Sequence, residues 1–253
     1  MSLFPRLIPV LLVSDGYLVK PVRFQGDTYI GDPINAVRIF NEKQVDELVI
    51  CDIDATPKRT GVNFQLIEEI ANEAFMPVGY GGGVASVDDA RRITGIGIEK
   101  VILNSAAVTE PDVVRGISDA LGASSTVVSI DAKKRLTGGW ETYSERGSRK
   151  AGMTPADAAR RAQDLGAGEV IASSIDREGT FSGYDTKLIQ TVTSAVSIPV
   201  IALGGARDMS DFHQALAAGA SGAAAGSTFV MTGKHHAVLI NYPAPSEVRT
   251  LAS

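Results

Sequence analysis

Four aspartates stand at, or just after, the ends of short apolar runs in this 253-residue sequence. The runs are rich in valine and isoleucine, which favours buried strands. A carboxylate at the end of such a strand is partly withdrawn from water and can be tuned to exchange protons with a ligand. Capping of the next helix or pairing with a loop lysine is the alternative, and it is at least as strong for Asp54. We interpret the four as candidate acid–base residues, with Asp131 foremost; they are Asp52, Asp54, Asp131 and Asp176.

Two glycine-rich segments, YGGGVAS (80–86) and ALGGARD (202–208), also follow apolar runs. Each is followed one unit later by small residues that open a helix, LNSAAVTEP (103–111) and AGSTFV (225–230). Glycine lets a phosphate approach the backbone, and the free N–H groups at a helix start favour an anion. Alternatively, the glycines only turn the chain at crowded strand ends. We predict two phosphate sites: one at Gly82, Gly83, Asn104 and Ser105, the other at Gly179, Gly204, Gly205, Gly226 and Ser227.

Helical patterns separate most of the apolar runs, which indicates a parallel sheet buried on both faces. The eight runs are LIPVLLV, LVICDI, MPVGYG, KVILN, STVVSID, EVIASSI, IPVIALGG and SGAAAGS. Eight strand–helix units in about 250 residues are typical of a (β/α)8 barrel. We therefore expect one barrel domain over residues 1–253, with a doubly wound open sheet as the alternative. The segment 14–33 is a candidate lid that carries Lys20.

An internal repeat supports the barrel. Shifting the chain by 122 residues aligns identical residues without a gap over roughly 60 positions. The aligned pairs include Glu47 with Glu169, Asp54 with Asp176, Gly82 with Gly204, and Ser105 with Ser227. Two half-barrels of four units each would account for this register, and coincidental strand–helix periodicity is the alternative.

Composition excludes several classes of protein. The net charge of −5 and the isoelectric point near 5.3 argue against nucleic acid or an anionic membrane as a partner. No apolar run approaches the roughly 18 residues of a membrane span, and the first residues lack the order of a signal peptide. Cys51 is the only cysteine, so neither an internal disulfide nor a thiolate cluster can form. We expect a cytoplasmic protein with no metal and no cofactor.

Four charged residues directly precede apolar runs, at the strand ends opposite to the aspartates. They are Arg6, Glu47, Lys100 and Glu169. Two charges of each sign could form a ring that closes the bottom of the barrel. The bottom face of such barrels usually serves stability, so the residues alone favour a salt-bridge plug; a gate on the barrel axis is the alternative.

Six motifs in order, over the chain to about residue 230, resemble the cyclase subunit of imidazole glycerol phosphate synthase. They are DELVICDIDA, VGYGGGV, VILNSAAV, VVSIDAKK, SSIDREGTFSGYD and IALGGA. The resemblance implies a duplicated half-barrel that binds a substrate with two phosphates. It also implies that a glutaminase partner docks on the bottom face and feeds ammonia through the barrel, so that ammonia reaches the substrate at the top.

Position by position, the resemblance assigns Asp131 to the second of the family's two catalytic aspartates and Lys20 to its loop lysine. Asp52, Ser173 and Asp176 match polar residues around the reacting centre. Gly82, Asn104, Ser105, Gly179, Gly205 and Ser227 match the phosphate sites. Arg6, Glu47, Lys100 and Glu169 match the charged gate of the ammonia channel, which shifts our interpretation of the ring from a plug to a gate.

Leu12 departs from the family pattern. The family's first strand ends in Cys-Leu-Asp-Val, and its aspartate is the first catalytic acid or base, whereas this chain has VLLV. Leucine can neither give nor accept a proton, so a two-acid ring closure should lose about 10²–10⁴-fold in rate.

Leucine at this position, with the segment YIGDPINAVRIFNEKQVDEL and the ending GKHHAVLINYP, resembles a paralogous branch of the family. That branch is associated with surface-polysaccharide synthesis, in which ammonia is supplied for amidino sugars. An ordinary cyclase of histidine biosynthesis and a non-catalytic ammonia conduit are the alternatives.

Overall fold

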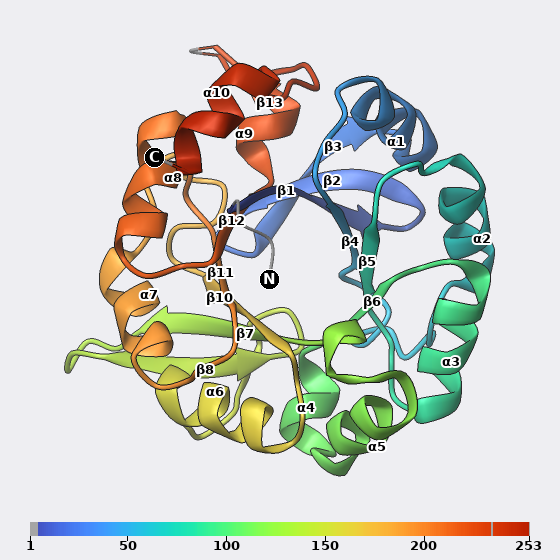
Figure 1. Ribbon diagram of the computed structural model, residues 1–253, viewed down its shortest axis with the longest axis vertical. Helices are drawn as coiled ribbons and strands as arrows, with labels where there is room; N and C mark the ends of the chain where they lie inside the picture. Colours follow the sequence, from blue (N-terminus) through green and yellow to red (C-terminus); the bar gives the residue numbers. More distant parts are fainter. Residues whose placement is uncertain (1–4, 234, 253) are drawn as a thin grey trace.

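Eight parallel strands close into a barrel surrounded by helices (Figure 1), as the sequence predicts. The computed structural model describes residues 5–233 and 235–252. Each barrel strand pairs with the next, and pairing of β12 with β1 and of β10 with β7 completes the circle. The barrel strands are β1 (Arg6–Ser14), β4 (Leu48–Asp52), β5 (Val78–Gly81), β6 (Lys100–Leu103), β7 (Thr126–Lys134), β10 (Glu169–Ser174), β11 (Val200–Leu203) and β12 (Gly222–Ala225).

The helices pack their apolar faces on the outside of the barrel. In α1, for example, Ala36, Val37 and Phe40 are buried, and the Asp32 side chain caps the first turn by accepting from the Asn35 N–H. The helices are α1 (Pro33–Glu42), α2 (Phe64–Glu73), α3 (Val87–Ile96), α4 (Ser105–Thr109), α5 (Asp112–Leu121), α6 (Pro155–Asp164), α7 (Thr186–Thr193), α8 (Met209–Ala217), α9 (Ser227–Val230) and α10 (Pro245–Arg249), with 3-10 turns η1 (Ala123–Ser125) and η2 (Thr250–Ala252). No helix of the described residues is long and apolar enough to cross a membrane.

The two halves of the barrel repeat the same backbone contacts at the 122-residue spacing. The Leu48 N–H donates to the Pro77 carbonyl at 2.9 Å, and the Val170 N–H donates to the Pro199 carbonyl at 3.0 Å. Likewise, Asp89 accepts from the Ala85 N–H, as Asp211 does from the Arg207 N–H; these pairs are also 122 residues apart. The internal repeat of the sequence is therefore a repeat of structure.

Side chains fill the barrel interior and separate its two ends. The interior cluster is formed by inward-facing residues of the strands, each almost wholly buried: Ile8, Val10, Val49, Ile102, Val127, Ile171, Ile201 and Ala224. Leu12, Cys51 and Leu203 pack on this cluster and are only partly buried. The interior is thus a packed apolar column, as expected for a barrel of eight strands.

In each half, the first strand continues beyond the barrel into an antiparallel hairpin. After β1 come β2 (Tyr17–Val22) and β3 (Gln25–Gly31), so the segment expected as a lid is a hairpin paired with β1. After β7 come β8 (Trp140–Ser144) and β9 (Arg149–Lys150). Near the C-terminus, β13 (Met231–Thr232) pairs with β14 (Ala237–Val238). The turns of the two large hairpins, at 23–24 and 145–147, have left-handed backbone conformations.

Candidate active site at the carboxyl end of the barrel

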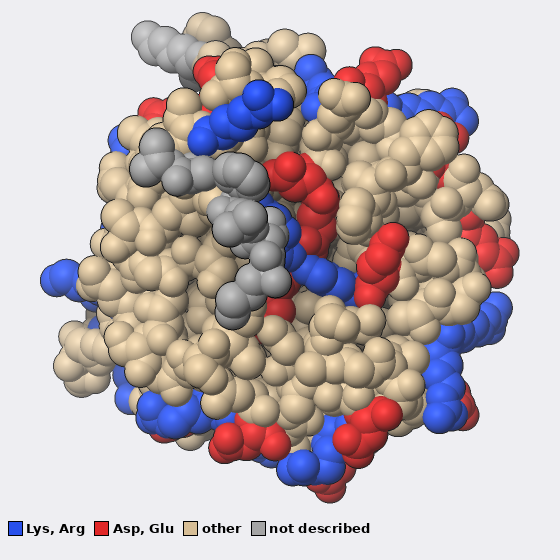
Figure 2. All heavy atoms as spheres, viewed as in Figure 1, with Lys and Arg blue, Asp and Glu red and all other residues tan. Residues whose placement is uncertain are grey.

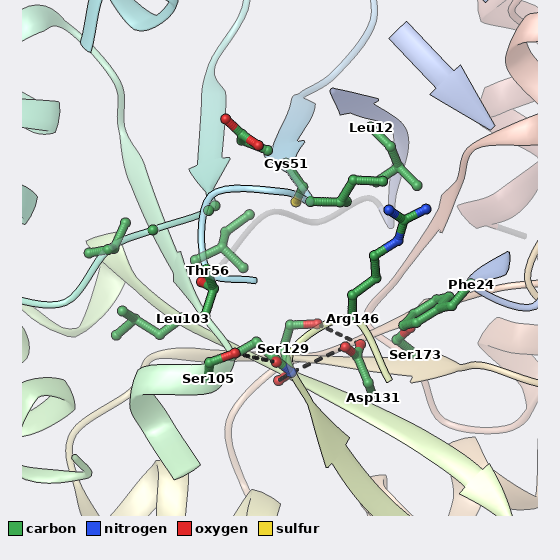
Figure 3. A pocket seen from close by; sticks show the side chains of 18 of the residues that line it. Leu12, Phe24, Cys51, Thr56, Leu103, Ser105, Ser129, Asp131, Arg146 and Ser173 are labelled. Atoms are coloured by element: carbon green, nitrogen blue, oxygen red, sulfur yellow. Dashed lines mark hydrogen bonds between the residues drawn. The ribbon is translucent and has the colours of Figure 1, made fainter. Parts of the chain in front are cut away.

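A cavity of about 160 Å³ lies where the barrel strands end, and it collects most of the predicted residues of the first half-barrel (Figure 3). Asp52, Asp131 and Ser173 line it. The first glycine cluster, Gly82, Gly83, Asn104 and Ser105, lines the same cavity. Carboxylates that can transfer protons and backbone donors that can bind an anion lie together in one concave site, which is typical of a candidate active site.

Asp131 is the best-placed acid or base. It lies on β7 next to Ser173 of β10, and the Asn104 side chain donates to its carboxylate at 3.2 Å. Enclosure by the cavity walls raises the pKa of Asp131 to about 7, and the nearby Glu178 adds to the rise, although hydrogen bonds from Ser173 and Ser129 oppose it. A carboxyl group with a pKa of about 7 can both give and take a proton near neutral pH.

The position that faces this acid from the first half-barrel is apolar. Leu12 lies in β1, in register with Cys51 of β4, and both line the cavity together with Leu203. Burial and the negative charge of Asp131 raise the pKa of the Cys51 thiol to about 12, so the thiol stays protonated. Leu12 and Cys51 therefore offer no group for proton exchange near neutral pH, and Asp52, next to Cys51 on β4, is the acid that this half contributes to the cavity.

Asp52 and Asp54 have different roles. Burial raises the pKa of Asp52, while the N–H groups of Asp54 and Ala55 donate to its carboxylate at 3.0 and 3.1 Å and oppose the rise. Asp54 accepts from Ser14 at 2.6 Å and from Lys58 at 3.0 Å, and these contacts hold its pKa below the ordinary value. Asp54 thus pairs with a loop lysine, which was the alternative to a catalytic role, and Asp52 remains the candidate at the cavity.

Both glycine clusters bring backbone segments too close for any side chain. A Cβ on Gly82 would lie 2.4 Å from the Asp52 carbonyl, and one on Gly83 would lie 2.6 Å from the backbone of Gly61. In the second half, a Cβ on Gly205 would lie 2.4 Å from the Gly183 carbonyl. All three glycines have positive φ, so these positions favour glycine on two counts.

The second cluster lies outside this cavity, and Lys20 lies beside one of its members, Gly226. Gly179, Gly204, Gly205, Gly226 and Ser227 are not among the described residues that line the cavity. The Lys20 ammonium lies 1.6 Å from where a Cβ on Gly226 would be, so the lysine fills the space that this glycine leaves. Lys20 is 3% exposed, and Glu178 lies 3.5 Å from its ammonium; burial lowers the pKa of Lys20 and Glu178 opposes that change.

Two residues that the sequence analysis missed face the cavity, and Asp176, like Lys20 and the second glycine cluster, does not line it. Asp176 turns away and accepts from the Lys134 N–H at 2.7 Å, whereas Glu178, two residues later, lines the cavity. Glu178 directly precedes Gly179, which was the one available signal. Arg146 also lines the cavity, but it lies in a hairpin turn, where nothing in the strand pattern marks it. Within the described residues, no group of three or more His, Cys, Asp or Glu could hold a metal ion.

At the opposite end of the barrel, the four predicted charged residues form a closed ring. Arg6 donates to both Glu47 and Glu169. Lys100 lies 2.8 Å from Glu47 and 3.1 Å from Glu169. Positive and negative side chains gather at the centre of this face in Figure 2. Each carboxylate is thus shared by two cations, and the ring covers the lower end of the apolar column.

Comparisons with known proteins agree with this geometry. The model of the family described as "Histidine biosynthesis protein" matches residues 6–235. A Pseudomonas aeruginosa protein named "Putative imidazole glycerol phosphate synthase subunit hisF2" is 46% identical over 94% of this chain and 95% of its own length. "Imidazole glycerol phosphate synthase subunit HisF" of Thermococcus gammatolerans is 39% identical over 88% of each chain. The chain therefore belongs to the histidine biosynthesis protein family, among the HisF-type subunits.

Proposed function

We propose that this chain is the synthase subunit of a glutamine amidotransferase pair with altered cyclase chemistry. In this proposal a glutaminase docks on the bottom face, and ammonia crosses the barrel to a diphosphorylated sugar- or ribotide-type acceptor in the top cavity. The acceptor belongs to amidino-sugar synthesis for surface polysaccharides, which the resemblance at Leu12 favours. The names of the relatives, which are subunits of a synthase, support the coarser part of the proposal.

The observation that carries the proposal is the pairing of one acid with one leucine at the two equivalent strand ends. Asp131 has a pKa of about 7, but Leu12 and the protonated Cys51 thiol provide no proton donor or acceptor near neutral pH at the strand ends that face it. A reaction that needs two positioned acids should therefore be slow here. Delivery of ammonia to an acceptor that needs one proton transfer remains possible for this site.

The barrel interior supports the ammonia route. Val10 and Ile102 both line the cavity floor and belong to the interior cluster, which extends down toward the ring. Neutral ammonia can enter an apolar column, whereas an ammonium ion would lose its hydration there at great cost. The column is packed, so passage of ammonia requires movement of side chains as well as opening of the ring.

The acids that remain around the cavity favour one alternative, an ordinary cyclase of histidine biosynthesis. Asp131, Asp52 and Glu178 all line the cavity, so Asp52 or Glu178 could act as the second acid in place of the aspartate that Leu12 replaces. The two proposals differ in what they expect from the histidine-pathway ribotide.

The test supplies purified chain with that ribotide and an ammonium salt, and measures imidazole glycerol phosphate. The Thermococcus gammatolerans relative serves as a positive control. We expect the present chain to turn over at least about 10²-fold more slowly, because one of two acids is missing. Turnover within a few-fold of that of the relative would contradict the proposal and favour the ordinary cyclase.

A further inference from the structure

Arg146 is the one lysine or arginine among the described residues that line the cavity. The acids Asp52, Asp131 and Glu178 line the same space and make it negatively charged when they are ionised. An anionic group in the cavity would be repelled by these carboxylates unless a cation faced it. We propose that Arg146 recognises a phosphate group of the acceptor at the first glycine cluster and determines specificity for it; this rests on the proposed function.

The hairpin turn that carries Arg146 is fastened to the glycine cluster. The Glu145 N–H donates to the Ser105 hydroxyl at 3.1 Å, and Ser105 belongs to the cluster. Arg146 is the next residue, so its side chain leaves the backbone beside the predicted phosphate position. Figure 3 shows that side chain extended over the cavity, with its guanidinium in the part of the view where Leu12 and Phe24 lie.

The backbone of this turn is held in an unusual conformation. Glu145 and Arg146 have φ of 50° and 57°, a left-handed geometry that costs free energy in residues other than glycine. Gly147, with φ of 76°, packs so closely that a Cβ there would lie 3.2 Å from the Phe24 ring. The Ser148 hydroxyl donates to the Glu145 carbonyl at 2.7 Å. The backbone position of Arg146 is therefore set by the fold.

The present partners of Arg146 are exchangeable. Its guanidinium pairs with Asp27 of β3 and lies 3.4 Å from Asp54. The side chains of Arg146 and Asp27 are 24% and 28% exposed, and ion pairs that water can reach contribute little. Asp54 keeps Lys58 and Ser14 when Arg146 leaves. A guanidinium binds phosphate through two parallel hydrogen bonds, so a phosphate can compete for it.

The test measures binding of ribose 5-phosphate, a phosphate monoester, by calorimetry at low salt, with ribose as the uncharged reference. Arg146→Ala should weaken binding at least tenfold, and Arg146→Lys should restore only part of the loss. Arg149→Ala is the matched control, because Arg149 lies in the same hairpin, pairs with Glu145 and does not line the cavity. It should bind within twofold of the native chain.

Asp27→Asn distinguishes phosphate recognition by Arg146 from a purely structural role (a latch), in which Arg146 only holds the hairpin through its ion pair with Asp27. Recognition predicts that this variant binds ribose 5-phosphate as tightly as the native chain or more tightly, because a competitor for Arg146 is gone. A latch predicts that Asp27→Asn and Arg146→Ala weaken binding equally, and that result would overturn the proposal. Unchanged binding in Arg146→Ala with weakened binding in Ser105→Ala would overturn the role of Arg146 alone. Absence of binding to the native chain would overturn the phosphate site as well.

Discussion

The strands β1 and β7 both leave the barrel into a hairpin, but they present different chemistry to the cavity. At the cavity, β1 contributes Leu12 and β7 contributes Asp131. The left-handed turns of the two hairpins contribute Phe24 and Arg146, which are 122 residues apart. The first strand and hairpin of the first half therefore supply apolar groups, and those of the second half supply an acid and a cation. The two halves share backbone contacts but differ in the side chains that they present at these strand ends.

The two glycine clusters show the same division. Their backbones match, since Gly82 lies against the Asp52 carbonyl as Gly204 lies against that of Ser174. Among the described residues, only the first cluster lines the cavity; in the second, Lys20 fills the space beside Gly226. The same substitution at equivalent positions of the two halves should therefore change stability equally where the two halves share backbone contacts. It should have unequal effects where their side-chain contacts differ.

The ring offers the largest test of equivalence. Glu47 and Glu169 are 122 residues apart, and each pairs with both Arg6 and Lys100. Glu47→Gln and Glu169→Gln should each lower the free energy of unfolding by about 3 kcal/mol, because each leaves two cations short of a buried partner. Urea unfolding measures this, with Glu73→Gln, in the water-accessible ion pair of Glu73 with Arg38, as a control expected to change the free energy of unfolding by less than about 0.5 kcal/mol. A large loss in only one of the two variants would show that the ring is not shared equally.

The glycine positions test the shared backbone. Gly82→Ala and Gly204→Ala should both destabilise the chain, by about 2 kcal/mol, since both residues have positive φ and approach a carbonyl. The loss should be larger for Gly82, whose added Cβ would lie 2.4 Å from the carbonyl oxygen rather than 2.8 Å. Gly95→Ala, inside α3 with open space around it, should instead stabilise by about 0.5 kcal/mol. Thermal unfolding compares the three variants, and an unchanged stability of Gly204→Ala would show that the backbones of the two glycine clusters are not equivalent.

The strand ends differ in how stability depends on pH. The folded-state pKa of Asp131 is about 7, above its unfolded value, so the contribution of its protonated form is complete below about pH 4 and is lost as the pH rises through 7. Between pH 5 and pH 8, Asp131→Asn should therefore gain on the order of 2 kcal/mol relative to the native chain. Leu12→Asn introduces no titrating group and should keep the native pH dependence. Parallel curves for the native chain and Asp131→Asn would contradict the raised pKa.

Much of this architecture can be predicted from the sequence, because alternating strand and helix patterns and a repeat register report directly on the backbone. The carboxyl ends of parallel strands converge, so Asp131, Asp52 and the first glycine cluster could be placed together in advance. Asp176 and Glu178 could not be distinguished, because the turn that carries them decides which side chain points inward. The burial of Lys20 depends on pairing of its hairpin with β1, which lies outside the reach of local patterns.

The central claim is that Leu12 removes half of a proton-transfer pair from a site that is otherwise retained. It is tested most directly by the ammonia-dependent conversion of the histidine-pathway ribotide to imidazole glycerol phosphate in the native chain and in Leu12→Asp. The account predicts slow conversion by the native chain and a gain of about 10²-fold or more in the variant, because a second acid then faces Asp131. Rapid conversion by the native chain, or no gain in Leu12→Asp, would contradict it.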